Sequence, residues 1–597
     1  MHPNPRLLPY YLAGSALLAL AVAGCDGDDN DGAAPGTVSA AGGGTVTSDD
    51  GAVSVSIPAG ALSTDAVVTL RRLDDNFATD LVPASAHTEF LSDPFEVVLE
   101  ATDGGAVSLT APMKVTVRSA ERPTHPTLGE LVEVGGRSSE RLASFYRAGE
   151  QRAVGLTTAT EGTYRVMFRT LQSASGDAVD RGQAVFMGET FGNEDFFGNV
   201  LGLHTALSDT VSPSLAVQLG VQVDINQVPQ SIVEVMTGDD LAAKTAALND
   251  PATTVALVQA GAVIGVKGFF EGADPNEMTS AGITCALCHV TVEPTEFVLD
   301  VDGTPTSVPL PIGQPLIDGV PNAALDGGAI IAATPGFQAN FPDAVSVLQG
   351  WGPGRFDVRA LDVPGVDRNP LEDGVVNPTA YPPIWNFVDL QEQDYRIGWD
   401  GLFQGEDALA SISEAVYDLI FHGNGAFGIP PFITVAGDGG TLPPNLAITP
   451  PQALVDGLVT AEDERPDNDI VPPQDLFDVQ AFMRSIASPA PMDFDAAQAE
   501  AGFELFHGEA NCSSCHATAD FTGPGRFVIT VPAPAGDLAE GIKVAGLRGV
   551  AHTAPFFHDG SAATLADVVS HYADNVAAVP TLTAAQQAAL VEYLKSL

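Results

Sequence analysis

The chain has 597 residues, of which 45% are hydrophobic, so it is long and apolar enough to build several domains with ordinary cores. It contains 76 acidic and 25 basic residues, which gives a formal net charge of −51. Because binding to phosphates requires Lys and Arg, this charge argues against nucleic acid as a partner and indicates a solvated acidic surface.

The N-terminal segment predicts export. Arg6 precedes an apolar run that ends in small residues at Cys25 and is too short for a comfortable membrane span. The sequence "VAGC" at 22–25 resembles the lipobox of bacterial lipoproteins, which implies that Cys25 is acylated. We expect a signal peptide over 1–24 and a flexible acidic tether over 25–37. The protein would then sit in the cell envelope, at the periplasm or cell surface, held to the membrane through its N-terminal lipid only. The alternative is an ordinary signal peptide in which the Cys is incidental.

Residues 38–172 predict an all-β sandwich. Apolar and polar residues alternate in "TVTSDDGAVSVSIPAGALSTDAVVTL" and "PMKVTVRSA", with Gly, Asp and Pro between the runs. The opening at 43–62 resembles the ZU-type β domain. This part carries no catalytic cluster, so we expect a spacer or adhesion module.

Four cysteines remain once Cys25 is set aside, and they form two copies of one motif. "CALCH" supplies Cys285, Cys288 and His289, and "CSSCH" supplies Cys512, Cys515 and His516. Two thiols at this spacing attach to the vinyl groups of a c-type haem, and the adjacent His becomes the proximal iron ligand. A redox dithiol, a four-Cys zinc site or disulfides would not require a His after each pair. The sequence therefore predicts two covalently bound c-type haems.

Two mainly α-helical haem domains are expected around these motifs, over 173–490 and 491–597. "DLAAKTAAL" (240–248) and "TTVALVQAGAVIGVKGFFE" (253–271) have helical spacing, whereas Pro and Gly between 300 and 395 predict long loops. In the second domain, Asp495 and a Thr583/Gln586 pair are expected to cap helices on either side of the haem motif.

A family resemblance refines this picture. "VAGLRGVAHTAPFFHDGSAATLADVVSHY" (544–572) resembles the C-terminal domain of bacterial di-haem cytochrome c peroxidases and MauG enzymes, and "YPPIWNFVD" followed by "GWDG" (398–401) resembles their N-terminal domain. The resemblance implies a reactive haem on Cys285 and Cys288 and an electron-transfer haem at the other motif. It also implies a bridging role for Trp399 and suggests calcium between the haem domains. Core packing is the alternative role of Trp399, and Trp351 and Trp385 are rivals for the bridge.

The sixth ligand of the second haem departs from the peroxidases. Their ligating Met falls at Tyr572 here, counted from His558, and no Met follows Met492. If Thr564 caps the helix, Tyr572 lies on its apolar face and His571 points about 100° away. MauG-type enzymes resemble the chain in having Tyr here, and an anionic phenolate favours ferric iron. His571 as the ligand and Tyr572 as a core residue remain alternatives. His558 is expected to hydrogen-bond near a haem propionate.

Opposite its proximal His, the first haem has one candidate of a conventional type for a sixth ligand or a distal acid–base residue. His422 is the only His between His289 and Met483, a stretch that contains no Met. It would ligate the iron or move protons on bound peroxide, near where the peroxidases have a catalytic Glu. The alternative is a surface His beside a Gly turn.

The sequence thus predicts a lipid-anchored di-haem enzyme that reduces hydrogen peroxide at the first haem. Electrons would come through the second haem from a small redox protein or an organic donor. The alternatives are a non-catalytic electron conduit and an oxygenase that uses dioxygen, as in the rubber-cleaving di-haem oxygenases that this family also resembles. A β-domain adhesin with accessory haems is the weakest hypothesis.

Overall fold

The structure is a computed structural model, and its description covers defined parts of the chain. These are residues 34–73, 88–120, 129–135, 138–147, 149–169, 176–190, 193–194, 197–198, 201–340, 342, 345–356, 378–387, 396–399, 403–404, 473–518, 520–528, 541–576 and 578–597. Cys25 and His422 lie outside the described residues.

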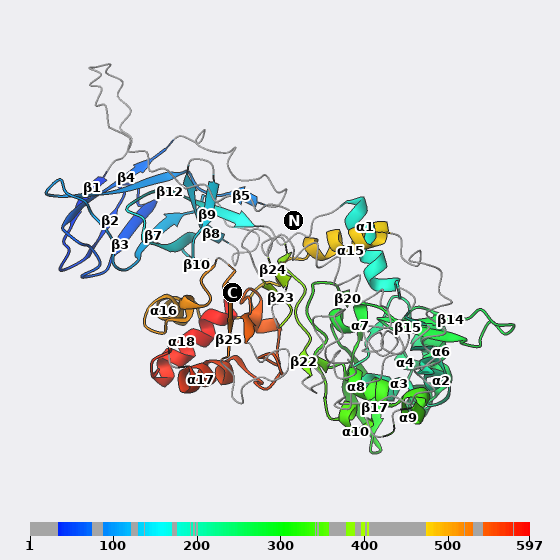
Figure 1. Ribbon diagram of the computed structural model, residues 1–597. Coiled ribbons are helices and arrows are strands. Elements are labelled where there is room, and N and C mark those ends of the chain that lie inside the picture. The colour runs from blue at the N-terminus through cyan, green and yellow to red at the C-terminus, as the bar shows by residue number, and fades with distance from the viewer. Residues whose placement is uncertain are drawn as a thin grey trace, which may run out of the picture.

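The N-terminal part, over 34–169, is the β region. Its described residues form two antiparallel sheets (Figure 1). In spatial order, the first contains β1 (Ala34–Val38), β4 (Ala66–Arg72), β6 (Phe95–Ala101), β12 (Glu161–Arg169), β8 (Gly129–Gly135) and β9 (Ser138–Arg141), with β5 (Thr88–Phe90) also paired to β12. The second contains β10 (Ser144–Arg147), β11 (Arg152–Thr157), β7 (Met113–Arg118), β3 (Val53–Ile57) and β2 (Gly44–Thr47).

The predicted alternation explains how these sheets pack. Along β3, Val53, Val55 and Ile57 are buried while the serines between them are partly exposed. Val68 of β4 and Val97 of β6, from the other sheet, belong to the same buried cluster as Val55. A two-residue period puts every second side chain on one face, so the two sheets share one hydrophobic core.

The middle region, over 177–485, mixes helices with two-stranded sheets. Its helices are α1 (Asp177–Gly188), α2 (Leu203–Asp209), α3 (Pro213–Gln218), α4 (Gln230–Thr237), α5 (Leu241–Leu248), α6 (Pro251–Gln259), α7 (Ala286–His289), α8 (Gly327–Ala332), α9 (Pro335–Asn340), α10 (Val345–Gln349) and α15 (Pro473–Ser485). The paired strands are β13 (Val223–Asp224) with β19 (Ile312–Gly313), β14 (Val266–Phe269) with β15 (Ser280–Ile283), β16 (Thr291–Val292) with β20 (Pro315–Leu316), β17 (Thr295–Val301) with β18 (Thr304–Leu310), β21 (Arg355–Phe356) with β22 (Thr379–Ala380), and β23 (Arg396–Ile397) with β24 (Phe403–Gln404).

Two expectations for this part were wrong. The helix predicted over 253–271 ends at Gln259, because Gly261 and Gly265 take left-handed φ values of 69° and 77°, and the chain continues as β14. The stretch predicted as loops from residue 300 contains the β17–β18 hairpin. Its turn is the dipeptide Asp302-Gly303, whose φ values are 54° and 80°. Asp-Gly favours tight hairpins because both residues tolerate positive φ. The described part of this region is therefore mixed rather than mainly helical.

The C-terminal part contains three principal helices, α16 (Ala496–His507), α17 (Leu565–Asn575) and α18 (Ala584–Lys595). It also contains the short η4 (Cys512–Ser514) and η6 (Val550–His552) and the pair β25 (Gly523–Phe527) and β26 (Ile542–Val544). The predicted caps are confirmed. Asp495 accepts from the backbone of Gln498, and Thr564 and Thr583 both form capping boxes.

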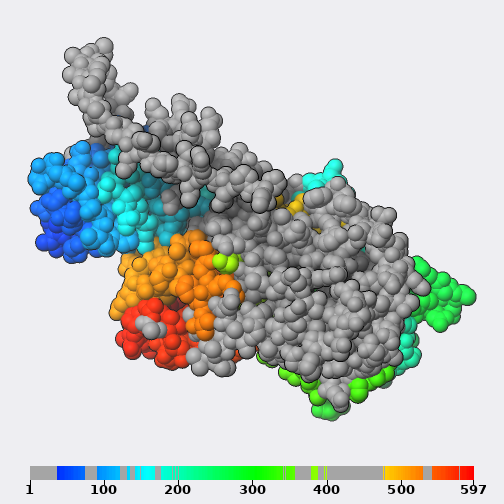
Figure 2. Space-filling model, in the orientation of Figure 1, coloured from blue at the N-terminus to red at the C-terminus, as the bar shows by residue number. Residues whose placement is uncertain are grey.

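The β region and the C-terminal part touch directly. Phe145 of β10 and Val154 of β11 are buried in one cluster with Phe503 and Tyr593. In the space-filling view the cyan β region meets the orange start of the C-terminal part (Figure 2). Within the described residues, no helix combines the length and the hydropathy needed to cross a bilayer.

Candidate haem sites

The C-terminal motif holds its histidine in a defined orientation. η4 begins at Cys512, and the backbone N–H of His516 donates to the Cys512 carbonyl oxygen (3.1 Å). The His516 Nδ1 lies 2.5 Å from the carbonyl oxygen of Phe521, which can only accept, so Nδ1 carries the proton. Burial lowers the pKa of His516 and keeps the ring neutral. In this tautomer the ring lone pair is on Nε2, which is the nitrogen that can ligate iron.

Helix α17 brings Tyr572 to the cysteines of this motif. Leu565 and Val569, on the same helical face, are buried in the hydrophobic core of the C-terminal part. The pKa of Tyr572 is raised by burial first, and then by the proximity of Cys512 and Cys515. The His571 ring packs against Phe557, with ring centroids 4.8 Å apart and ring planes tilted by 58°. Tyr572 is therefore the residue of this pair that faces the motif.

The His558 turn contacts the part of the chain that precedes the C-terminal domain. The carbonyl oxygen of His558 accepts from the backbone N–H of Ala380 (2.7 Å), and that of Asp559 accepts from Arg355 Nη1 (3.2 Å). The ring Nδ1 of His558 is buried without a hydrogen-bond partner, and burial lowers its pKa. A buried ring nitrogen of this kind suits a polar group brought by a cofactor.

The first motif forms the short helix α7, which starts after Cys285. Burial raises the pKa of Cys285 to about 11 and that of Cys288 to about 12, so neither thiol is the low-pKa thiolate of a redox dithiol. Burial also lowers the pKa of His289 to about 4, and its Nδ1 is buried without a hydrogen-bond partner. A neutral buried imidazole next to two protonated thiols fits covalent haem attachment and iron ligation.

Two residues that the sequence did not indicate lie against the first motif. Asn322, which is 2% exposed, donates from its backbone N–H to the Cys288 carbonyl oxygen (2.8 Å) and from Nδ2 to the Leu287 carbonyl oxygen (3.3 Å). The Tyr381 hydroxyl is buried without a geometric hydrogen-bond partner; burial first, then the nearby Cys288, raises its pKa well above the ordinary value. Tyr381 opens the "YPPIWNF" stretch, which could have drawn attention to it. Asn322 has no local signal.

The tryptophans differ in what they connect. Trp399 is partly buried; its Nε1 donates to the carbonyl oxygen of Ala380 (2.9 Å), and its own carbonyl accepts from the Lys543 N–H (3.0 Å). Trp385 packs in a cluster with Ala286 of α7 and donates from Nε1 to the Arg548 carbonyl oxygen (3.0 Å). Trp351 is buried in the core of the middle region. Trp399 and Trp385 thus both contact the C-terminal part, whereas Trp351 is a core residue.

A segment of the middle region approaches both sites at once. β22 lies between the C-terminal helices and the region that holds α7 (Figure 1). Its Ala380 donates to His558 and accepts from Trp399, and the next residue, Tyr381, lies beside Cys288. For calcium, the described residues contain no group of three or more His, Cys, Asp or Glu suited to a metal ion.

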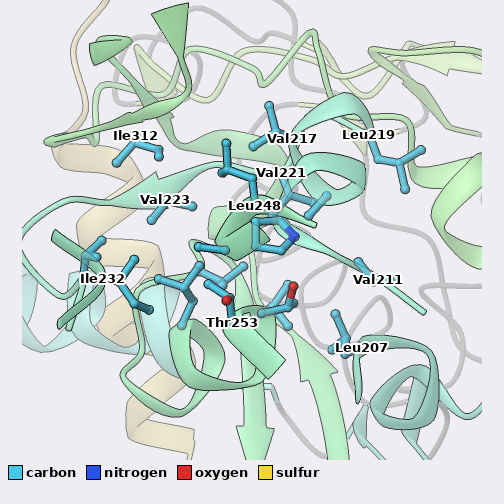
Figure 3. Close-up of a pocket in the computed structure, with 18 of the residues that line it drawn as sticks. Leu207, Val211, Val217, Leu219, Val221, Val223, Ile232, Leu248, Thr253 and Ile312 are labelled. Atoms are coloured by element: carbon cyan, nitrogen blue, oxygen red, sulfur yellow. The ribbon is translucent and has the colours of Figure 1, made fainter. Parts of the chain in front are cut away.

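A cavity of about 140 Å³ is lined in part by helix α7. Ile283 and Leu287, on either side of Cys285, form part of its wall. The rest is almost wholly aliphatic (Figure 3), and includes Leu207, Val211, Val221, Ile232, Leu248 and Ile312. Thr254 also lines it, and its buried hydroxyl has no hydrogen-bond partner. A cavity with this apolar lining suits a small apolar molecule.

Comparison with known families agrees with the C-terminal site. The cytochrome c family profile matches residues 499–597, which include Cys512, Cys515 and His516. This region is a cytochrome c domain and carries at least one c-type haem, on the 512–515 cysteines.

The chain is also similar to a particular protein. It is 31% identical over 115 residues to the methylamine utilization protein MauG of Methylorubrum extorquens, an alignment that covers 15% of this chain and 32% of that protein. The chain thus matches about a third of the length of this curated relative. A solved structure of a MauG-like protein associated with microbial copper homeostasis aligns at 22% identity and a TM-score of 0.19, over 23% of this chain and 60% of that one. The chain therefore contains a C-terminal cytochrome c domain, and part of the chain is distantly similar to MauG.

Proposed function

We propose that the protein is an exported di-haem oxidoreductase of the peroxidase/MauG kind, with a second haem on Cys285 and Cys288. The observation that carries this proposal is the segment at Ala380–Tyr381. Tyr381 lies beside Cys288 of the first motif, while Ala380 donates to His558 of the C-terminal domain. One short segment that lies beside the first motif and also contacts the C-terminal domain at His558 suits two cofactors that exchange electrons.

Each residue has a role in this proposal. His289 and His516 would bind the two irons through neutral imidazoles, and Tyr572 would supply the sixth ligand of the second. Trp399 would bridge the two sites, and His422 would act on the far side of the first haem. When bound, the haems supply the oxidising chemistry toward peroxide. Trp385 is the competing bridge because it contacts both α7's cluster and Arg548.

The test is to add one equivalent of hydrogen peroxide to the purified diferric protein and follow the haem spectrum by stopped flow. Rapid formation of a long-lived oxidised species is the expected result. No change, in either the diferric or the half-reduced protein, would point to a non-catalytic electron conduit.

The role of Tyr572 has its own test. Replacing the phenolate changes the charge at the iron, so Tyr572→Phe should alter the absorption and EPR spectra of the second haem. His571→Gln is the matched control on the same helix and should leave them unchanged. If Tyr572→Phe keeps the wild-type spectra, Tyr572 is not a ligand.

The aliphatic cavity favours a second candidate function, a di-haem oxygenase that combines dioxygen with an apolar substrate. Its wall includes Leu287, which lies between the two haem-binding cysteines. Consumption of dioxygen by the reduced protein, stimulated by a small apolar compound, would support this function. Its absence together with a positive peroxide result would leave the first proposal.

The remaining features complete the proposal. Cys25 would carry the lipid that keeps the protein in the cell envelope, and a small redox protein or an organic donor would supply electrons. The family resemblance also proposes calcium between the haem domains. The β region, which resembles the ZU-type domain, would act as a spacer or an adhesion module.

A further inference from the structure

The β region is attached to the cytochrome domain by more than a linker. Phe145 of β10 stacks on Phe503 of α16, with ring centroids 6.2 Å apart, and is 6% exposed. Ion pairs flank this contact: Lys114 with Glu504, Arg147 with Glu500, and Arg141 with Asp520. An apolar centre with surrounding charge pairs is the anatomy of a specific interface.

The third ion pair differs from the other two in geometry and burial. Arg141 Nη1 and Nη2 donate to the two carboxylate oxygens of Asp520 at 3.0 and 3.2 Å. The side chains are only 13% and 5% exposed, whereas Glu504 and Glu500 are 54% and 28% exposed. A bidentate guanidinium–carboxylate pair that is shielded from water fixes the orientation of the carboxylate.

The residue after Asp520 is the one that orients the haem ligand. Phe521 accepts the hydrogen bond from His516 Nδ1 (2.5 Å). Its backbone has a left-handed φ of 56°, which is costly for a bulky side chain and persists only where neighbours enforce it. Those neighbours are Asp520 and Arg548. Asp520 is held by the two short hydrogen bonds from Arg141 and by a longer ion pair with Arg548 Nε (3.8 Å), and the Arg548 guanidinium lies 5.0 Å from the centre of the Phe521 ring.

We infer that Arg141 of the β region is a positioning residue for the C-terminal haem. It fixes Asp520, and through the strained backbone of Phe521 it fixes the carbonyl oxygen that binds His516. A proximal His that donates a firm hydrogen bond is more electron-rich and favours ferric iron. The β region therefore tunes the potential of this haem, in addition to any spacer role. This inference uses only the haem at Cys512 and Cys515, so it does not depend on the peroxidase proposal.

The test compares Arg141→Lys, Arg141→Gln and Arg147→Lys in the full haem-loaded protein. Lys keeps the charge at 141 but loses the bidentate geometry. Arg147→Lys is the matched control, because it alters an ion pair of the same interface that does not adjoin Phe521. The readouts are the EPR g-values and the midpoint potential of the C-terminal haem.

We expect Arg141→Lys to change the g-values and to raise the potential, because the His516 hydrogen bond weakens while the local charge stays constant. A tenfold change in the reduction equilibrium, about 59 mV for one electron, is the expected scale. Arg147→Lys should change neither readout. Wild-type values in both Arg141 variants would overturn the inference. A shift in Arg141→Gln without one in Arg141→Lys would also overturn it, since that pattern reports charge alone.

Discussion

Gly502 lets two helices of the cytochrome domain cross at close range. A Cβ placed there would lie 2.1 Å from the carbonyl oxygen of Ala589 and 2.7 Å from the Cβ of Tyr593, both on α18. Ordinary contacts begin near 3.4 Å, so the helices would have to separate by about 1 Å. The obstruction is backbone, which cannot rotate away as a side chain can.

Two effects of Gly502→Ala oppose each other. Helix propensity alone favours Ala over Gly by about 1 kcal/mol. Overpacking a close helix contact costs about 2–3 kcal/mol, because the core on both sides is displaced. We therefore expect a net loss of about 1–2 kcal/mol, which for a domain of about 100 residues lowers Tm by about 5–10 °C.

The assay is thermal unfolding followed at the Soret band of the C-terminal haem. Gly188→Ala is the control, because Gly188 ends α1 and a Cβ there would meet open space. The control should leave the melting curve unchanged or slightly raise Tm. A Gly502→Ala protein as stable as the parent would refute the close packing of α16 on α18.

Two further predictions concern buried polar groups. Burial lowers the pKa of His507 to about 4, so between pH 6.5 and 4 the unfolded chain binds a proton that the folded chain does not. Folding stability should therefore fall as the pH falls through this window, by about 2 kcal/mol at pH 5, and level off below pH 4. His507→Gln should flatten the change in Tm between pH 7 and 5; an unchanged slope would contradict this assignment. Asn322→Ala should cost about 1–3 kcal/mol, because Nδ2 would no longer satisfy the buried carbonyls of Gly220 and Leu287. Chemical denaturation should detect this loss, and Asn226→Ala, at an exposed turn, should show none.

Features that depend only on residues close together in the sequence could be predicted from it. The caps at Asp495, Thr564 and Thr583 depend on side chains two or three positions from the groups they bind, and the strands of the β region follow a two-residue period. The same holds for the haem motif at 512–516, whose spacing is fixed by the porphyrin that it binds. The hairpin at Asp302-Gly303 also has a local signal in this dipeptide. The many Pro and Gly residues around it favoured a prediction of loops instead.

The tertiary structure alone decided which distant residues support the sites. Arg141 and Asp520 are 379 positions apart, and Tyr381 reaches Cys288 across 93 positions. The left-handed backbone of Phe521 is likewise invisible in the sequence, because a bulky residue adopts it only when its neighbours compel it. Local chemistry therefore determined where haem binds and how the helices begin. Contacts between distant segments determined how the His ligand is held, since their energies depend on burial and orientation that arise only when the chain folds.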